Sequence, residues 1–303
     1  MKSSEYKIYT LIILCVLFWS GNFIIGRYIK DDIEALEMVF FRWGFTLILV
    51  SPILIYKYKN ILNSIKNNFP ILFILSFLGI SLFNTILYIG LHTTTSTNAL
   101  IINSSIPMLI LLFSFFIFKT KIKYNQFIGI LISSFGVLYL ILKGEISSFT
   151  SMQFTTGDLL VVLSSLSWAL YSTLVKLKPT DITDSEYFSI IVLIGFIIIL
   201  PVYLYQGYSI SDQINLVKNN YLIFIYISVF TSLLSYYFWH LGIKYIGASK
   251  TGQFTHLMPI FGTILAYIFL DEILKNYHII GAVLIGFGIY LSLFYNRKTV
   301  NEK

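Results

Sequence analysis

The residues of this sequence that could do chemistry are a few polar and aromatic side chains set inside long apolar segments. Asn84 and Tyr88 are four residues apart, and Trp168 and Tyr171 are three apart, so each pair would share one face of a helix. Such side chains offer hydrogen bonds together with aromatic faces for stacking or cation–π contact with an organic molecule. The candidate binding residues are Trp19, Asn22, Asn84, Tyr88, Asn103, Trp168, Tyr171, Tyr236 and His256.

Two ionisable residues lie well inside apolar segments, and their expected roles differ. His256 could contact a ligand or relay a proton near neutral pH, or it could be a neutral histidine hydrogen-bonded between helices. Arg42 is interpreted as structural, because a long basic side chain can reach outward to an interface or pair with a carboxylate. Glu34 and Glu37 are the expected partners of Arg42.

The motifs of enzyme chemistry are missing from the sequence. It has no His-Glu-x-x-His, no Gly-x-Ser-x-Gly and no Gly-x-x-x-x-Gly-Lys motif, and its one cysteine, Cys15, forms neither a metal cluster nor an internal disulfide. Asp158, Asp271 and Glu272 fall at expected helix ends rather than deep in a segment, where proton-driven pumps usually carry a carboxylate. We therefore expect no enzyme activity, no cofactor and no metal.

The apolar segments themselves have the length of membrane-spanning helices. Hydrophobic residues make up 57% of the chain and charged residues 12%, and a helix needs about 20 apolar residues to cross a bilayer. Tyr237 and Trp239 are expected in an aromatic belt at the membrane interface. The expected spans are Ile8–Ile25, Leu36–Tyr56, Ile71–Leu91, Thr97–Phe118, Tyr124–Leu142, Gly157–Leu177, Tyr187–Tyr205, Tyr221–Leu241, Ala248–Leu270 and Tyr277–Tyr295.

The distribution of basic residues fits ten such spans. With both termini on one side, the segments on that side hold 15 of the 21 Lys and Arg residues, the opposite segments hold five, and Arg42 lies within a span. Because cytoplasmic loops are enriched in Lys and Arg, we expect a multi-pass protein of the cytoplasmic membrane with both termini in the cytoplasm. The same bias accounts for the net charge of +7 without a nucleic-acid partner.

An internal repeat relates the two halves of the chain. Gly90, Pro107, Gly129 and Gly136 recur as Gly242, Pro259, Gly281 and Gly288, each pair 152 residues apart, and the same offset relates Ser104 to His256. Each half then holds five spans, and an odd number places the halves in opposite orientation, as in many secondary transporters. We expect an all-α integral membrane protein of ten transmembrane helices, arranged as two inverted five-helix repeats (residues 1–145 and 155–298) around a central cavity.

The sequence resembles the EamA-type members of the drug/metabolite transporter superfamily over nearly its whole length. The resemblance is carried by Phe18–Phe23, Arg42, Gly90–Asn98 continuing to Pro107, Trp168–Ser172, Gly242–Lys250 and Pro259 with Leu270–Glu272. It implies two five-helix repeats around a cavity, peripheral fifth and tenth helices, and passage of amino acids or other small metabolites. Lys119-Thr120 replaces the Gly-Glu pair that usually closes the fourth helix, and Lys250 stands at the repeat position of Asn98.

The expected function is secondary transport or export of small organic metabolites, such as amino acids or related amphipathic compounds, by alternating access. A passive channel is the main alternative, followed by an intramembrane enzyme or a sensor. The expected partners are a small-molecule substrate and the lipid bilayer, and the sequence leaves open whether the protein is a monomer or a homodimer. The nine candidate residues are expected to form the binding cavity between the repeats.

Overall fold

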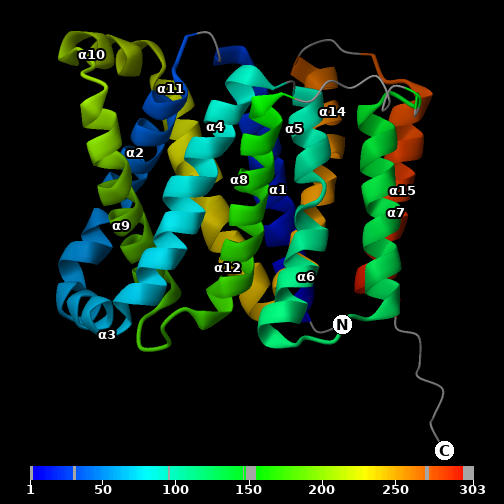
Figure 1. Cartoon of the computed structure of the whole chain (residues 1–303), viewed down its shortest axis with the longest axis horizontal. Helices are drawn as coiled ribbons and strands as arrows, with labels where there is room; N and C mark the ends of the chain where they lie inside the picture. The colour runs from blue at the N-terminus through cyan, green and yellow to red at the C-terminus, as the bar shows by residue number, and fades with distance from the viewer. Residues whose placement is uncertain are drawn as a thin grey trace, which may run out of the picture.

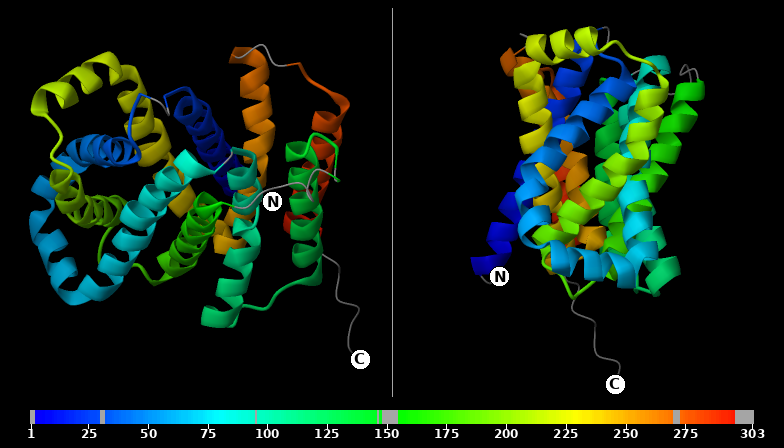
Figure 2. Two further views of the ribbon diagram at one scale, coloured as in Figure 1. Left: turned by 45° about the horizontal axis from the view of Figure 1, so that its top comes forward. Right: turned by 90° about the vertical axis from the view of Figure 1, so that its left-hand side faces the viewer.

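The structure is a bundle of helices that lie side by side. The computed structural model describes residues 3–29, 32–94, 96–145, 147, 155–269 and 273–295, and every regular element within these ranges is helical. Helix α10 (Ile210–Asn219) lies across one end of the bundle, and α7 (Tyr124–Ile141) and α15 (Asn276–Leu293) form one edge of it (Figures 1 and 2). Asp271 and Glu272, which were expected at a helix end, lie outside the described residues.

Several of the long helices are assembled from shorter elements. The first half also holds α1 (Ser3–Ile29), α2 (Ala35–Tyr56), α3 (Tyr58–Ser76), π-helix η1 (Phe77–Leu82), α4 (Phe83–Thr93), α5 (Ser96–Asn103) and α6 (Ile106–Phe118). The second half also holds α8 (Thr156–Leu174), 3₁₀ helix η3 (Val175–Leu177), α9 (Asp184–Tyr205), α11 (Tyr221–Tyr226), π-helix η4 (Ile227–Leu234), α12 (Ser235–Ile246), α13 (Ala248–Gln253), 3₁₀ helix η5 (Phe254–Leu257) and α14 (Met258–Phe269).

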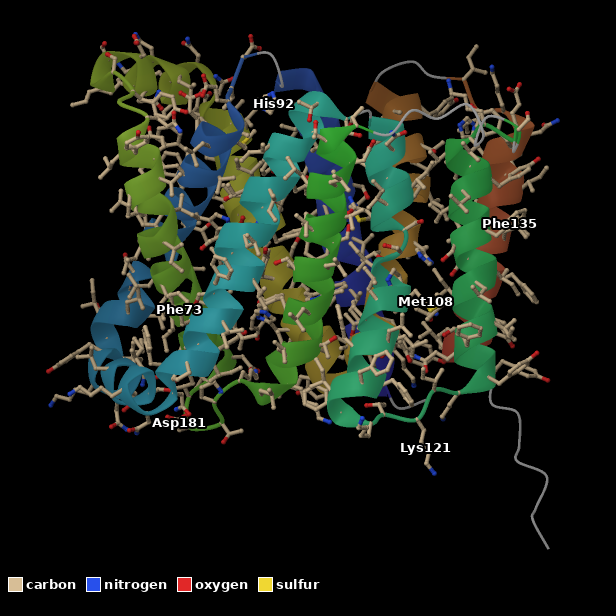
Figure 3. The ribbon with its side chains drawn as sticks, in the orientation of Figure 1. Phe73, His92, Met108, Lys121, Phe135 and Asp181 are labelled. Atoms are coloured by element: carbon tan, nitrogen blue, oxygen red, sulfur yellow. The ribbon has the colours of Figure 1, made fainter. Side chains whose placement is uncertain are left out.

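Eight helical stretches among the described residues are long and apolar enough to cross a membrane. Of the other two expected spans, the first lies in α1, where residues 6–22 form a shorter apolar stretch, and the ninth is divided among α13, η5 and α14. Large apolar side chains also cover the outside of the bundle: Phe116 and Ile279 are more than half exposed, and Phe135 points away from α7 (Figure 3). Ten membrane crossings stay a prediction.

Two polar stretches that were expected as loops are helical. Helix α3 starts at Tyr58, well before the expected span, and it bends at Asn68, whose backbone is not helical (φ −127°, ψ 21°). Pro70 follows the bend, and a proline cannot donate the backbone hydrogen bond that would continue a regular helix. Helix α10 has one apolar and one polar face, a pattern that is typical of a helix lying along a surface.

Among the described residues, each half of the chain has one π-helical segment within a long helix. Segment η1 joins α3 to α4, and η4 joins α11 to α12. A π-helical turn is wider than an α-helical turn, and such turns are frequent at functional sites. Gly79 in η1 lies 152 residues before Thr231 in η4, so the two irregular segments occupy matching places in the repeat.

Helices α7 and α15 pack closely because glycines face each other across their contact. A Cβ atom on Gly129 would lie 2.5 Å from the Gly288 carbonyl oxygen, and one on Gly136 would lie 3.0 Å from the Gly281 carbonyl oxygen. Small residues of this kind let the backbones of membrane helices approach each other directly. The pairing is crosswise, since Gly129 corresponds to Gly281 in the repeat but contacts Gly288.

We expect Gly288→Ala to destabilise the protein by about 1–3 kcal/mol, the usual cost of overpacking. A Cβ atom at Gly288 would lie 2.5 Å from the Ser133 backbone nitrogen, so α7 and α15 would have to move apart. Gly286→Ala is the matched control, because a Cβ atom there has nothing within 4 Å. Thermal unfolding of both variants in detergent checks this, and equal Tm values would contradict the packing account.

We expect Lys119→Gly to stabilise the protein by about 1 kcal/mol. Lys119 ends α6 in the left-handed conformation (φ 53°, ψ 30°), which costs free energy for any residue with a Cβ atom. Lys123→Gly is the control, because Lys123 has φ −82° and removal of its side chain relieves nothing. An increase of Tm in both variants, or in neither, would show that the backbone of Lys119 is not strained.

Candidate functional site

A cavity lies between the two halves of the chain at the level of Trp19 and Trp168. It is narrow, about 70 Å³, and α1, α2, α4, α5, α8, α12, η5 and α14 all contribute to its wall. Its wall combines aromatic rings, amides and two basic side chains: Trp19, Phe83, Trp168, Tyr236, Asn22, Asn84, Asn103, Arg42 and His256. Such a wall can stack on an apolar group and hydrogen-bond a polar one.

The structure brings most of the predicted site residues to this cavity. Seven of the nine line it: Trp19, Asn22, Asn84, Asn103, Trp168, Tyr236 and His256. Tyr88 lies behind the wall, where its hydroxyl accepts a hydrogen bond from Asn22 Nδ2 at 3.1 Å. Tyr171 packs against the Trp168 ring, with 5.3 Å between ring centroids. Both tyrosines therefore support residues of the wall.

Arg42 was expected to reach outward to the interface or to pair with Glu34 or Glu37, and the structure corrects both expectations. The Arg42 side chain turns to the cavity, where Nε donates to Ser232 Oγ (2.7 Å), Nη1 to the Tyr88 hydroxyl (3.3 Å) and Nη2 to the Thr231 carbonyl oxygen (3.2 Å). Glu37 lies five residues away, which is roughly 140° around a helix at about 100° per residue.

Glu37 instead has partners at the end of the bundle that α10 crosses (Figure 1). Its carboxylate accepts hydrogen bonds from Gln213 Nε2 of α10 at 2.5 Å and from the Glu34 backbone amide at 3.0 Å. Arg42 is therefore a charged residue of the cavity wall that the nine candidates did not include. Its position within an apolar span was the available signal, but the direction of its side chain could not be read from the sequence.

The two π-helical segments present carbonyl oxygens to aromatic residues of the cavity wall. The Tyr236 hydroxyl donates to the Gly79 carbonyl of η1 at 2.7 Å, and Trp19 Nε1 donates to the Thr231 carbonyl of η4 at 3.0 Å. Each bond joins one half of the chain to the other. The wall rings are thus oriented by backbone atoms that occupy matching places in the repeat.

Residues that match in the repeat also touch each other beside the cavity. Asn84 Nδ2 donates to the hydroxyl of Tyr236, its counterpart 152 residues later, at 3.3 Å. His256 Nε2 lies 2.9 Å from the carbonyl oxygen of Ser104, again 152 residues away. The other ring nitrogen of His256 lies 2.7 Å from Ser133 Oγ, so both nitrogens have protein partners and the histidine joins α7 to the wall.

An aromatic layer closes the cavity on one side. Tyr171 and His240 each lie about one turn beyond a wall residue along their helices, and the Tyr171 hydroxyl lies 2.5 Å from His240 Nε2. Trp239 belongs to the same layer: it is fully buried, and its Nε1 donates to Ser172 Oγ at 3.1 Å. The prediction that Trp239 lies in an interfacial belt was therefore wrong, because its ring faces the inside of the bundle, whereas Tyr237 is 38% exposed.

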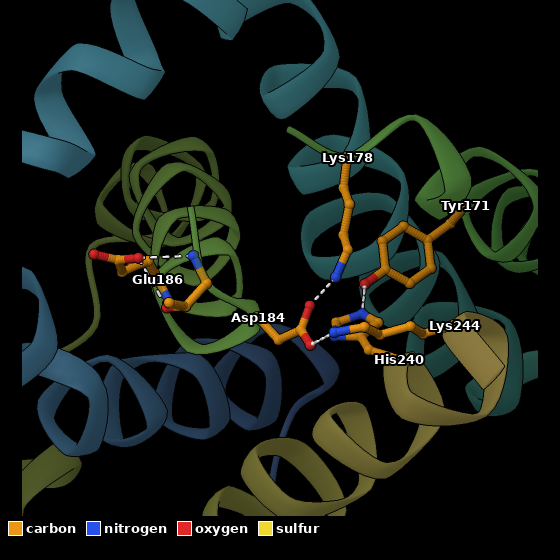
Figure 4. Close-up of polar contacts among 7 residues, drawn as sticks. Tyr171, Lys178, Asp184, Glu186, His240 and Lys244 are labelled. Atoms are coloured by element: carbon orange, nitrogen blue, oxygen red, sulfur yellow. Dashed lines mark hydrogen bonds and ion pairs between the residues drawn. The ribbon is translucent and has the colours of Figure 1, made fainter. Parts of the chain in front are cut away.

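Beyond the aromatic layer lies an ion-paired cluster. Asp184, at the start of α9, binds Lys178 through one carboxylate oxygen and Lys244 through the other, at 2.7 Å for Lys244 (Figure 4). These residues lie at the end of the bundle where Figure 3 shows Lys121 and Asp181, and His92 marks the opposite end. We call the first of these the lysine-rich end.

The described residues bring no three His, Cys, Asp or Glu side chains together in a way that could hold a metal ion. The chemistry that this arrangement offers is binding: stacking on the rings of Trp19, Trp168 and Tyr236, hydrogen bonding to amides, and contact with the guanidinium of Arg42.

Comparison with known proteins agrees with this geometry. The model of the EamA-like transporter family matches residues 6–142 and 155–294. The uncharacterized transporter YyaM of Bacillus subtilis is 27% identical over 283 residues, which is 93% of this chain and 92% of the relative. The S-adenosylmethionine uptake transporter of Rickettsia conorii is 24% identical over 295 residues, with 96% and 94% of the two chains covered.

The fold also occurs in a solved structure. A crystal structure of another protein superposes with a TM-score of 0.70, at 14% identity, over 95% of this chain and 96% of that chain. The resemblance proposed from the sequence is confirmed by the family match, which covers nearly the whole chain in two segments. The protein is a multi-pass membrane protein that belongs to the EamA-like transporter family.

Proposed function

We propose that this protein is a secondary transporter for small organic metabolites that carry a carboxylate, such as amino acids or related amphipathic compounds. The observation that carries the substrate class is Arg42. Its side chain is 3% exposed and lines the cavity, and no carboxylate among the described residues lies within ion-pair distance of it. A buried charge is costly unless it is paired, so a substrate carboxylate is its natural counter-ion.

The hydrogen bonds of Arg42 leave room for such a substrate. A guanidinium has five N–H donors, and the three bonds to Ser232, Tyr88 and Thr231 use three of them. The remaining donors suit a carboxylate, which accepts hydrogen bonds from a guanidinium in a planar arrangement. Trp19, Trp168 and Tyr236 would pack against the apolar or aromatic part of the same molecule.

The proposal includes two inverted five-helix repeats, residues 1–145 and 155–298, related by a pseudo-two-fold axis through the cavity. Residues that match in such a repeat touch only near the axis. The contacts of Asn84 with Tyr236 and of His256 with Ser104 support this arrangement, as does the crosswise glycine pairing of α7 with α15. Inverted repeats of this kind place the substrate between them and expose it alternately to the two sides.

The proposed orientation places the lysine-rich end in the cytoplasm, since cytoplasmic segments of membrane proteins are enriched in Lys and Arg. Alternating access then requires the layers between the cavity and this end to open. These layers are the Tyr171–His240 contact and the Lys178–Asp184–Lys244 ion pairs. Because both contacts are formed in the structure, the proposal identifies its conformation as one closed toward the lysine-rich end.

We expect purified protein in proteoliposomes to move carboxylate-bearing solutes selectively from a mixture of amino acids, amines, nucleosides and sugars. The mixture includes S-adenosylmethionine, because a relative carries the name of its uptake transporter. Arg42→Gln should slow the carboxylate-bearing solute tenfold or more, the factor expected from losing a charge-assisted hydrogen bond of about 1.5–3 kcal/mol. Mass spectrometry of the vesicle contents measures both rates.

Arg42→Lys is the matched control for charge, and it should retain more of the flux than Arg42→Gln. A carboxylate-bearing solute that the wild type and Arg42→Gln move at the same rate would contradict the role of Arg42 and with it the substrate class. Movement of all small solutes without saturation would favour a channel over a transporter. No movement of any solute by folded protein would contradict transport of the tested classes.

We also expect Trp168→Ala and His256→Ala to reduce transport at least tenfold while the protein stays inserted. Trp168 provides a face of the cavity, and His256 holds η5 against Ser104 and Ser133. Phe135→Ala is the control, because Phe135 is 47% exposed on the outer side of α7. Flux is measured together with Tm and the gel-filtration profile, and unchanged flux in both cavity variants would refute the site.

A further inference from the structure

A second cavity, separate from the central one, opens at the lysine-rich end. Its volume is about 540 Å³, within the range of pockets that hold small organic ligands. The segment after α6, the start of α7 and the ends of α8, α12 and α15 contribute to its wall together with α13. Among the described residues its lining includes six lysines and no Asp or Glu; the lysines are Lys121, Lys123, Lys176, Lys178, Lys244 and Lys250. We call this cavity the vestibule.

Most of the positive charge in the vestibule lacks a counter-ion among the residues that the structure describes. Lys178 and Lys244 share the single carboxylate of Asp184, and Lys176 lies over the Phe118 ring, 4.8 Å from its centroid. The other three lysines form no ion pair within the part of the chain that the structure describes. Like charges that converge on one cavity repel each other, and a bound anion would relieve that repulsion.

Two buried polar atoms at the vestibule wall have no hydrogen-bond partner among the described residues. They are Nδ1 of His240 and Oγ of Ser292, on side chains that are 2% and 4% exposed. Buried polar atoms of native proteins nearly always have a partner, so these two point to a ligand or to water. When the Tyr171 hydroxyl donates to His240 Nε2, the neutral ring carries its proton on Nδ1 and can donate to an anion.

We propose that the vestibule binds a phosphate-bearing anion, which competes with Asp184 for Lys178 and Lys244. Lysine ammonium groups act as point charges that suit the several oxygens of a phosphate, and six lysines are among the described residues that line the vestibule. The phosphate can belong to a soluble metabolite or to the headgroup of an anionic lipid. Binding does not depend on the proposed transport function, whereas an effect of binding on transport rate does.

Competition with Asp184 follows from the shared lysines. Lys178 and Lys244, which both bind Asp184, line the vestibule, and His240 of the aromatic layer lines it too. Figure 4 shows these side chains together. An anion that attracts Lys178 and Lys244 weakens their contacts with the start of α9. It thereby acts on the same ion pairs that must separate before the central cavity can open toward this end.

The test uses the full-length protein in detergent and pyrophosphate as the probe, at constant ionic strength. Titration calorimetry is expected to show saturable binding to the wild type. The variant Lys121→Gln/Lys123→Gln/Lys250→Gln should bind at least tenfold more weakly. The matched control Lys57→Gln/Lys59→Gln/Lys66→Gln removes the same charge from the α2–α3 segment, outside the vestibule, and should bind as the wild type does.

Equal weakening in the two triple variants would overturn the proposal, because it would show general attraction to a basic surface. Absence of saturable binding to the wild type would overturn it as well. A second variant keeps the proposal testable if the Lys121/Lys123/Lys250 triple variant does not fold. Asp184→Asn frees Lys178 and Lys244 and should tighten pyrophosphate binding severalfold. Unchanged or weaker binding by folded Asp184→Asn would contradict the competition.

The source of the phosphate is distinguished in nanodiscs. Replacing phosphatidylcholine by phosphatidylglycerol should weaken pyrophosphate binding if lipid headgroups reach the vestibule, and this weakening should vanish in the vestibule variant. Unchanged affinity in the two bilayers assigns the site to soluble phosphates. Transport measured with and without pyrophosphate on the lysine-rich side then separates the two proposals, since binding without any flux would leave the anion site intact and contradict the transport function alone.

Discussion

The organisation of this bundle depends on one constraint, which is that a buried arginine among apolar helices must have partners for its donors. Arg42 of α2 satisfies three of them on Tyr88 of α4 and on Ser232 and Thr231 of η4. The same Thr231 carbonyl accepts the indole N–H of Trp19, and the Tyr88 hydroxyl accepts from Asn22, so α1 joins the network. The central cavity lies beside this network. Trp19 and Asn22 of its wall hydrogen-bond to the same Thr231 carbonyl and Tyr88 hydroxyl that accept from Arg42.

Backbone features determine how closely the helices pack around this network. Glycines bring α7 against α15, and Gly79 lets the Tyr171 ring approach η1, where a Cβ atom would lie 2.5 Å from it. The π-helical turns direct the carbonyls of Gly79 and Thr231 to donors from the opposite half of the chain. Both halves of the chain therefore contribute side chains to the cavity wall.

The apolar helices and most of the cavity residues could be predicted from the sequence. The directions of individual side chains could not, because they depend on how the helices pack. Length and hydropathy located the apolar helices, and the cost of polar groups in a bilayer identified seven residues that line the cavity. The direction of Arg42 and the burial of Trp239 depend on which face of a helix meets its neighbours, which hydropathy cannot decide in a helix that is apolar all round. The π-helical turns and the helical start of α3 have no comparable signal, and the vestibule arises only where lysines from distant segments meet.

The most direct test of the account is a counterflow measurement with whichever solute the reconstituted protein moves. Proteoliposomes are filled with a high concentration of unlabelled solute, and a trace of labelled solute is added outside. A carrier whose single site faces one side at a time predicts that labelled solute transiently accumulates inside above its equilibrium level. Labelled solute that approaches equilibrium without an overshoot, in vesicles where the same protein moves that solute, would show a continuous pathway and contradict alternating access.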